Sequence, residues 1–247
     1  NKASQMGTSL LLSVVIPIFN ERDNVTSLVE EIHTALVGVC DFEVIFIDDA
    51  STDDSLAILT ELKGSFPFIR AVTHNKRSGQ SAGLRTGVLA AKGSLIVTLD
   101  GDGQNDPADI PKLLERHKSL SGSDFLMVTG HRVNRKDTWA KRKSSRAANA
   151  IRRILLKDNN PDTGCSLKLY DRALFLRLPY FDHMHRFLPA LAKRENCRVE
   201  VVPVNHRHRA YGQSKYANID RLLVGIPDLI GVMWLIKRSP SNLKSKE

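Results

Sequence analysis

The chain has 247 residues, 42% of them apolar and 26% charged, which is the composition of a folded globular protein with one sizeable core. Its net charge of +9 falls within residues 131–157, where ten Lys or Arg accompany one acid (10 − 1 = +9). The rest of the chain is neutral, so the excess is a local patch for an anionic surface or ligand. Three widely spaced cysteines exclude a disulfide framework and favour a reducing compartment.

Residues 1–9 lack the apolar centre of an export signal and are predicted to form a loose leader. Apolar runs then alternate with helix-spaced apolar residues. Strands are predicted over 10–16, 42–47, 68–73 and 94–99. Helices are predicted over about 25–36, 52–62 and 80–91. This alternation predicts an α/β fold, a mostly parallel sheet flanked by helices, in a domain over residues 10–216.

The second half of the domain repeats the pattern less regularly. A helix is predicted from Pro107 to Leu114, and strands over 125–129, 166–170 and 199–204. Within residues 131–157, which we call the basic segment, a loop is predicted to about Lys143, followed by a helix.

Residues 217–247 are predicted to form an amphipathic, membrane-proximal helix and a tail. Apolar residues recur at helical spacing, but Pro227 and Asp228 interrupt them, and no uncharged run approaches the roughly 20 residues of a membrane span. Two roles remain open for this helix: resting on lipid or a partner, or packing on the domain's own core.

The stretch from Ser94 to Pro107 is the most informative in the chain. A buried strand ends there in D-G-D-G-Q, so that Asp100, Asp102 and the amide oxygen of Gln104 can offer oxygen ligands to Mg²⁺ or Mn²⁺. A calcium loop is excluded, because Asn105 stands where glycine is needed and Pro111 where glutamate is needed. A plain polar turn remains the alternative for an isolated D-x-D.

Polar residues follow the other predicted strands as well, over 17–21, 48–53 and 75–79. Because parallel strands end at one edge of the sheet, these groups predict a nucleotide site with a metal for the phosphates. The chain has neither a G-x-x-x-x-G-K-[ST] loop nor a G-x-G-x-x-G turn. Transfer from a nucleotide-activated group is therefore expected.

Six motifs in register carry a family resemblance between about Leu11 and Tyr216. They are S-V-V-I-P-I-F-N-E, I-D-D-A-S-T-D, L-D-G-D-G-Q-N-D-P, H-R-V-N-R-K-D, D-T-G-C-S-L-K-L-Y and H-R-H-R-A-Y-G-Q-S-K-Y. The first three resemble those of family 2 glycosyltransferases of the GT-A (Rossmann-like) fold. The last three resemble those of the branch that glycosylates polyprenyl phosphates and includes dolichyl-phosphate mannose synthase.

The resemblance implies roles for individual residues. Pro17, Asn20, Glu21, Asp49 and Asp100 would bind the nucleotide, and Asp100, Asp102 and Gln104 the metal. Arg132, Arg135, Arg209, Ser214 and Lys215 would bind the diphosphate and the acceptor phosphate. Asp102, Asp162, Arg132 and Lys215 would act in catalysis, with Asp162 as a candidate acid that could also be only a turn carboxylate.

Structural roles are the simpler interpretation for four other polar residues. Asp48 and Asp53 are expected to have structural roles near a helix start, and His206 and His208 are more typical of loop fillers than of ligands.

The implied reaction is metal-dependent, inverting transfer of a sugar from a nucleotide-sugar to a polyprenyl phosphate. UDP-linked hexose or hexuronate is favoured as donor, with GDP-mannose left open. The protein is expected to lie peripherally at the cytoplasmic face of a membrane, without nucleic acid; a homo-oligomer is compatible with the sequence. Two alternatives remain, a nucleic-acid-binding module that uses the basic segment and a nucleotidyltransferase.

Overall fold

The structure, a computed structural model, describes residues 11–120, 122, 124–133, 152, 155–156, 158, 160–208 and 218–238, with only the backbone described for 218–224. In this part of the chain a seven-stranded sheet has the order β3-β2-β1-β4-β6-β5-β7. The strands are β1 (Leu11–Ile18), β2 (Asp41–Asp48), β3 (Ile69–Thr73), β4 (Leu95–Thr98), β5 (Leu126–Arg132), β6 (Lys168–Asp171) and β7 (Arg198–Val204).

The pairing of the strands brings the predicted polar loops together. β1 runs parallel to β2 and β4, β2 parallel to β3, and β5 parallel to β7, whereas β6 is antiparallel to both of its neighbours. The carboxyl ends of six strands and the start of β6 therefore share one edge, which we call the site edge. The predicted mostly parallel sheet is confirmed; the antiparallel direction of β6 was not predicted.

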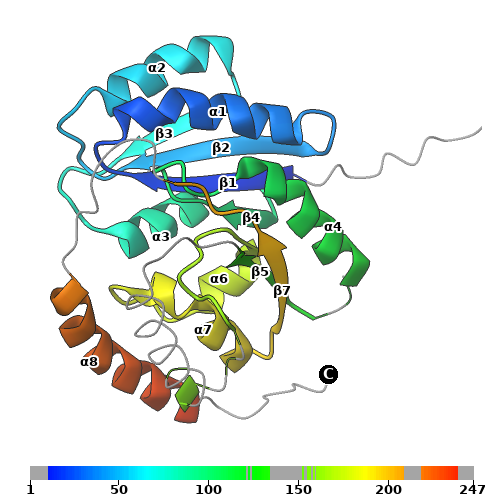
Figure 1. Ribbon diagram of the computed structural model, residues 1–247, viewed down its shortest axis with the longest axis vertical. Helices are drawn as coiled ribbons and strands as arrows, with labels where there is room; N and C mark the ends of the chain where they lie inside the picture. The colour runs from blue at the N-terminus through cyan, green and yellow to red at the C-terminus, as the bar shows by residue number, and fades with distance from the viewer. Residues whose placement is uncertain are drawn as a thin grey trace, which may run out of the picture.

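Helices cover both faces of the sheet (Figure 1). One face packs against α1 (Arg22–Leu36), α2 (Ser55–Ser65) and α4 (Ile110–Leu120), which follows the short helix η1 (Pro107–Asp109). The other face packs against α3 (Gln80–Ala90), α6 (Arg172–Arg177), η2 (Met184–Arg186), α7 (Leu188–Arg194) and α8 (Asn218–Lys237). The predicted strands and longer helices agree with these elements, but α6, η2 and α7 are shorter than two helical turns and were missed.

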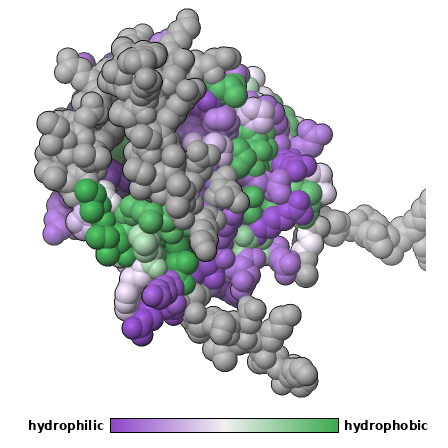
Figure 2. All heavy atoms as spheres, turned by 60° about the horizontal axis from the view of Figure 1, so that its bottom comes forward, coloured by the Kyte–Doolittle hydropathy of each residue, from purple (hydrophilic) through white to green (hydrophobic). Residues whose placement is uncertain are grey.

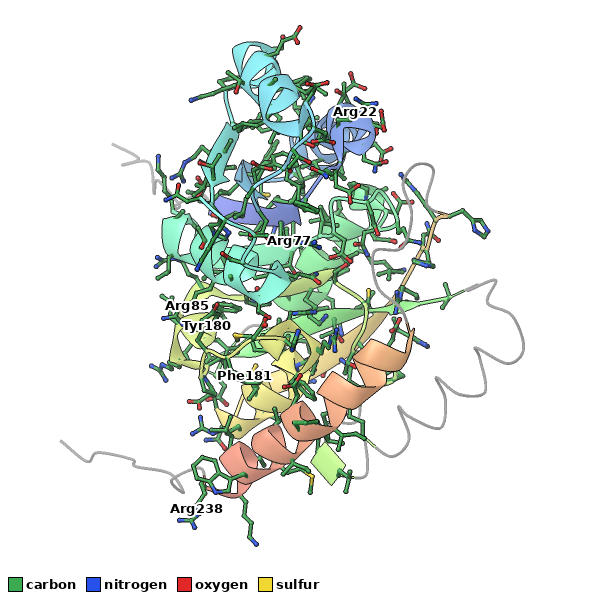
Figure 3. All side chains as sticks on the ribbon, turned by 90° about the vertical axis from the view of Figure 1, so that its left-hand side faces the viewer. Arg22, Arg77, Arg85, Tyr180, Phe181 and Arg238 are labelled. Carbon is green, nitrogen blue, oxygen red and sulfur yellow. The ribbon has the colours of Figure 1, made fainter. Side chains whose placement is uncertain are left out.

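Helix α3 is also joined to the segment that follows α6. Figure 3 shows Arg85 beside Tyr180, and the guanidinium carbon of Arg85 lies 4.5 Å from the centre of the Tyr180 ring. Such a cation–π contact adds to the packing of α3 on its own side of the sheet.

Helix α8 has two apolar faces. Val232 is buried, and Leu229, Leu235 and Ile236 pack with it against α7 and the core behind the sheet. The outward side exposes large apolar side chains, which form a patch over α8 in Figure 2; they are Ile226, Ile230, Met233 and Trp234. The helix predicted at this end of the chain is confirmed, and it does pack on the domain's own core.

No helix in the described ranges is both long enough and apolar enough to span a bilayer.

Candidate active site at the carboxyl edge of the sheet

The two motif carboxylates follow β4 at the site edge. Asp102 is buried and Asp100 partly buried. Burial, together with the negative charge of Asp102, raises the pKa of Asp100 to about 6, although Ser166, Lys168 and Arg132 oppose the shift. Two carboxylates that repel each other in a poorly solvated place favour a bound cation.

Glycine is required at positions 101 and 103 of the motif for two different physical reasons. A Cβ atom on Gly101 would lie 2.5 Å from Cγ2 of Ile18, so glycine lets the motif pack closely against β1. Gly103 has a φ of +71°, which makes the turn that carries Gln104 past Asp102. The backbone N–H of Gln104 then donates to Asp102 Oδ1 at 3.1 Å, which fixes one oxygen of that carboxylate.

The side chains near the motif supply only some of the ligands that a divalent cation needs. Among the described residues, no three His, Cys, Asp or Glu side chains are grouped to hold a metal ion by themselves. Mg²⁺ in nucleotide enzymes is often held by one or two carboxylates, with phosphate and water oxygens completing the shell. Asp100 and Asp102 meet that requirement, and the role of Gln104 as a third ligand stays a prediction.

Asp49 follows β2 and holds the loop after β3. Its Oδ1 accepts hydrogen bonds from His74 Nδ1 and the N–H of Ser78, and its Oδ2 accepts from the N–H of Gly79, each at 2.8 Å. Burial opposes ionisation, but these hydrogen bonds outweigh it and lower the pKa of Asp49. A carboxylate has about four acceptor positions, so one remains for a ligand.

The ring of Phe19 and the Arg77 guanidinium complete this part of the site edge. Arg77, labelled in Figure 3, belongs to the same loop as Ser78, and its guanidinium carbon lies 4.1 Å from the centre of the Phe19 ring. An aromatic ring and a cation thus lie at the site edge, the cation in the loop that Asp49 holds, and such groups could bind a planar base and its phosphates.

The loops after β1 and β2 are joined by hydrogen bonds. The N–H of Asn20 donates to Ser51 Oγ at 2.9 Å, and Asn20 Oδ1 accepts from the N–H of Thr52 at 2.8 Å. The N–H of Glu21 donates to Ser55 Oγ at 2.9 Å. Asn20 and Glu21 thus lie at the site edge as predicted and also have a structural role there.

Three further residues in or near these strand ends bind the backbone or pack against a helix. Asp48 accepts from the N–H of Ser51 at 3.3 Å and Asp53 from that of Ser55 at 3.0 Å, which is the structural role expected for them. Pro17 faces α3, where a Cβ atom on Gly83 would lie 2.9 Å from its Cβ.

Arg132, at the end of β5, forms a buried ion pair with Asp162. Its Nε and Nη2 donate to the two carboxylate oxygens at 2.7 Å each, and its backbone N–H donates to Oδ2 at 3.1 Å. Burial disfavours the charged guanidinium, yet Asp162 outweighs this and raises the pKa of Arg132. Asp162 is therefore engaged by Arg132 here, and its role as an acid stays a prediction.

Much of the predicted phosphate-binding set lies outside the described residues: Arg135, Arg209, Ser214 and Lys215. Most of the basic segment does too. Within its described part, Arg152 donates to Asp158 Oδ2 at 2.6 Å; the Asp158 side chain is buried and that of Arg152 is partly buried. Arg132 and Arg152 are thus neutralised by carboxylates just beyond the segment, so the patch is less positive than the sequence count suggested.

The loop after β7 is attached to the motif loop. His206 forms an isolated backbone bridge with Asn105, and the N–H of Arg207 donates to the carbonyl of Gln104 at 3.0 Å. The Arg207 guanidinium pairs with Asp106 and with Glu31, at 2.6 Å each. His206 thus lies next to the metal motif, whereas His208 is exposed.

Sequence reasoning missed three residues that contact the motif or act on its charge. Gln80 Nε2 donates to Asp100 Oδ1 at 2.7 Å, and Asn105 Oδ1 accepts from the N–H of Asp100 at 3.1 Å. Lys168 is buried and donates to the carbonyls of Thr163 and Cys165; burial lowers its pKa. Only Asn105 carried a signal, as the polar residue next to D-G-D-G-Q.

Comparison with known proteins agrees with this geometry. Residues 13–178 match the model of "Glycosyl transferase family 2". A dodecaprenyl-phosphate galacturonate synthase of Rhizobium johnstonii is 37% identical over 93% of this chain and 68% of its own length. An undecaprenyl-phosphate 4-deoxy-4-formamido-L-arabinose transferase of Sodalis glossinidius is 34% identical over 83% of this chain and 63% of its own length. The chain thus spans about two thirds of these relatives.

Solved structures share the fold at lower identity. Glucosyl-3-phosphoglycerate synthase of Mycobacterium tuberculosis, in complex with Mn²⁺, UDP and glucosyl-3-phosphoglycerate, superposes with a TM-score of 0.65 at 18% identity. That match covers 94% of this chain and 81% of the other. The same enzyme with Mg²⁺ and UDP gives a TM-score of 0.65 at 20% identity. The GT-A-like fold is thereby confirmed, and the chain belongs to glycosyl transferase family 2.

Proposed function

We propose that this protein transfers a sugar from a nucleotide-sugar to a polyprenyl phosphate in a metal-dependent, inverting reaction. The observation that carries the proposal is the grouping of Asp100 and Asp102 beside Arg132 at the site edge, in a chain whose relatives are named for sugar transfer to polyprenyl phosphates. Paired carboxylates suit a metal-bound diphosphate, and an arginine suits a phosphate.

The proposed donor is a UDP-linked hexose or hexuronate. A galacturonate synthase among the relatives and bound UDP in the structural neighbours support it. Asp49 supports it as well, because three of its acceptor positions are used within the chain. One remaining position matches the single imide N–H of uracil better than the neighbouring N–H groups of guanine, which makes GDP-mannose the weaker candidate.

In the proposed reaction an oxygen of the acceptor phosphate attacks C1 of the donor sugar. The new bond joins this oxygen to C1, and the bond from C1 to the diphosphate oxygen breaks, so the electron pair leaves with UDP. A divalent cation held by Asp100 and Asp102, with Gln104 as a further ligand, would neutralise the charge that develops on the diphosphate. Attack from the side opposite UDP inverts C1.

The chain's own groups would mainly position the reactants. A phosphate monoester is largely a dianion at neutral pH, since its second pKa is about 6, so the nucleophile needs no strong base. This agrees with Asp162 being engaged by Arg132. Arg132, held in place by that pair, would orient the acceptor phosphate together with Arg135, Arg209, Ser214 and Lys215.

The outward face of α8 is proposed to contact the membrane that holds the acceptor. Ile226, Ile230 and Trp234 are 53%, 63% and 59% exposed, and they lie on one side of the helix. The guanidinium carbon of Arg238 lies 5.9 Å from the Trp234 ring centre, so a cation borders the apolar patch. Apolar residues bordered by cations favour the surface of an anionic bilayer. Free cysteines fit its cytoplasmic face.

The test is mass spectrometry of products from a panel of UDP- and GDP-sugars, each incubated with a polyprenyl phosphate and Mn²⁺. A glycosylated lipid phosphate from a UDP-hexose or UDP-hexuronate supports the proposal. Release of pyrophosphate would indicate nucleotidyl transfer instead. No lipid product with any donor would contradict the proposal.

A further inference from the structure

The first turn of α3 contacts three separate parts of the molecule through three consecutive residues. The N–H of Gly79 donates to Asp49 Oδ2 at 2.8 Å, and Gln80 Nε2 donates to Asp100 Oδ1 at 2.7 Å. The hydroxyl of Ser81 lies 2.8 Å from Nδ1 of His185 in η2. Asp49 follows β2 and Asp100 follows β4, so this turn joins carboxylates that lie on either side of β1.

The position of α3 is closely fixed by the strands beneath it. A Cβ atom on Gly87 would lie 2.3 Å from Cγ1 of Val15 and 2.6 Å from Cδ1 of Ile47, which only glycine allows. The Thr86 hydroxyl lies 2.9 Å from Nε2 of His74, the histidine whose other ring nitrogen binds Asp49. Helix α3 therefore fixes the position of Gln80 relative to the sheet.

Asp100 itself is held by three residues. Asn105 accepts from its backbone N–H at 3.1 Å, the Gln80 amide donates to its Oδ1, and Ser166 also hydrogen-bonds its carboxylate. The contact with Gln80 therefore restricts the rotation of the carboxylate that would bind a cation. Such supporting contacts orient ligands and change metal affinity in many sites.

We propose that Gln80 is the positioning residue for Asp100, and that the first turn of α3 couples metal binding at Asp100 to nucleoside binding at Asp49. The inference rests on the proposed function, because it assigns the metal to Asp100 and the base to Asp49. Gln80 touches neither reacting group and acts through the carboxylate. Loss of its amide should weaken Mn²⁺ binding about tenfold, the lower end of the usual effect of a removed supporting contact.

The experiment compares the full chain carrying Gln80→Met or Ser81→Ala with the wild type. Gln80→Met keeps the length of the side chain but removes the donor. Ser81→Ala is the matched control, because it removes the next hydrogen bond along the same turn without touching either acid. Electron paramagnetic resonance of free Mn²⁺ in the presence of UDP gives the metal affinity, and calorimetry without metal gives the affinity for UDP.

We expect Mn²⁺ affinity to fall about tenfold in Gln80→Met, with metal-free UDP binding unchanged and Ser81→Ala like the wild type. The enhancement of UDP affinity by Mn²⁺ should shrink in Gln80→Met. A folded Gln80→Met protein with wild-type Mn²⁺ affinity would overturn the inference alone, as would equal losses in Gln80→Met and Ser81→Ala. A wild type that binds neither UDP nor Mn²⁺ would overturn the proposed function as well.

Discussion

Asp100→Asn should stabilise the metal-free protein while weakening its metal site. The pKa of Asp100 is raised from 3.8 to about 6 by burial and by Asp102, so above that pH the folded protein carries a charge that the unfolded chain solvates better. Two pH units correspond to about 3 kcal/mol, which is a ceiling because the side chain is partly exposed, and we expect about 1–2 kcal/mol. Asparagine keeps the shape and the acceptor for Gln80.

The sign of the effect fixes its pH dependence. Between about pH 4 and pH 6 the folded state binds more protons than the unfolded state, so wild-type stability falls as pH rises through this window. The gain in Asp100→Asn should therefore be largest above about pH 6 and vanish below about pH 4.

Urea unfolding across this pH range, with and without Mn²⁺, measures the effect. Mn²⁺ at about a hundred times its dissociation constant should stabilise the wild type by about 2.7 kcal/mol and the variant far less, which reverses their order. A variant that is no more stable at neutral pH, or that gains as much from Mn²⁺ as the wild type, would refute the reasoning.

Three further predictions concern other parts of the site. Asp102→Asn should reduce Mn²⁺-dependent turnover at least a hundredfold with an unchanged circular dichroism spectrum, and unchanged turnover would exclude Asp102 as a ligand. Arg132→Ala should raise the KM for the acceptor more than that for the donor, since Asp162 loses its partner near the acceptor phosphate, and equal changes in steady-state kinetics would count against this role. Ile230→Asp should abolish sedimentation with anionic vesicles while unfolding stability changes by less than about 0.5 kcal/mol, because Ile230 is 63% exposed; continued sedimentation would place the contact elsewhere.

The residues of the site edge could be predicted from the sequence because their placement depends on local sequence patterns. Each polar loop directly follows an apolar strand, and parallel strands must end together, so the approach of Asp49 to Asp100 follows from the alternation of strands and helices alone. The D-G-D-G-Q spacing likewise places Asp100 and Asp102 side by side without knowledge of the rest of the chain.

The contacts that tune these carboxylates could not be predicted in the same way. Arg132 pairs with Asp162 across 30 positions, and Gln80 reaches Asp100 across 20, so each contact depends on the register between distant elements. In the sequence Arg152 belongs to a positively charged segment, but in the structure Asp158 neutralises its charge. Composition records such charges but not their partners.

Helix α8 shows a further limit of prediction from sequence. Its apolar spacing was compatible with a core face or a membrane face, and both are present on different sides of the helix, with Val232 inward and Ile230 outward. Periodicity gives the width of an apolar stripe, but only the position of the helix on α7 shows how much of that stripe is covered.

The central claim is transfer of a sugar to a lipid phosphate with release of the nucleoside diphosphate. Its most direct test is to quantify UDP and glycosylated lipid from one reaction of the wild-type protein with a UDP-sugar, polyprenyl phosphate vesicles and Mn²⁺. We predict equal amounts of the two products, with neither formed when the lipid is omitted. UDP released with free sugar, at the same rate with and without the lipid, would contradict it.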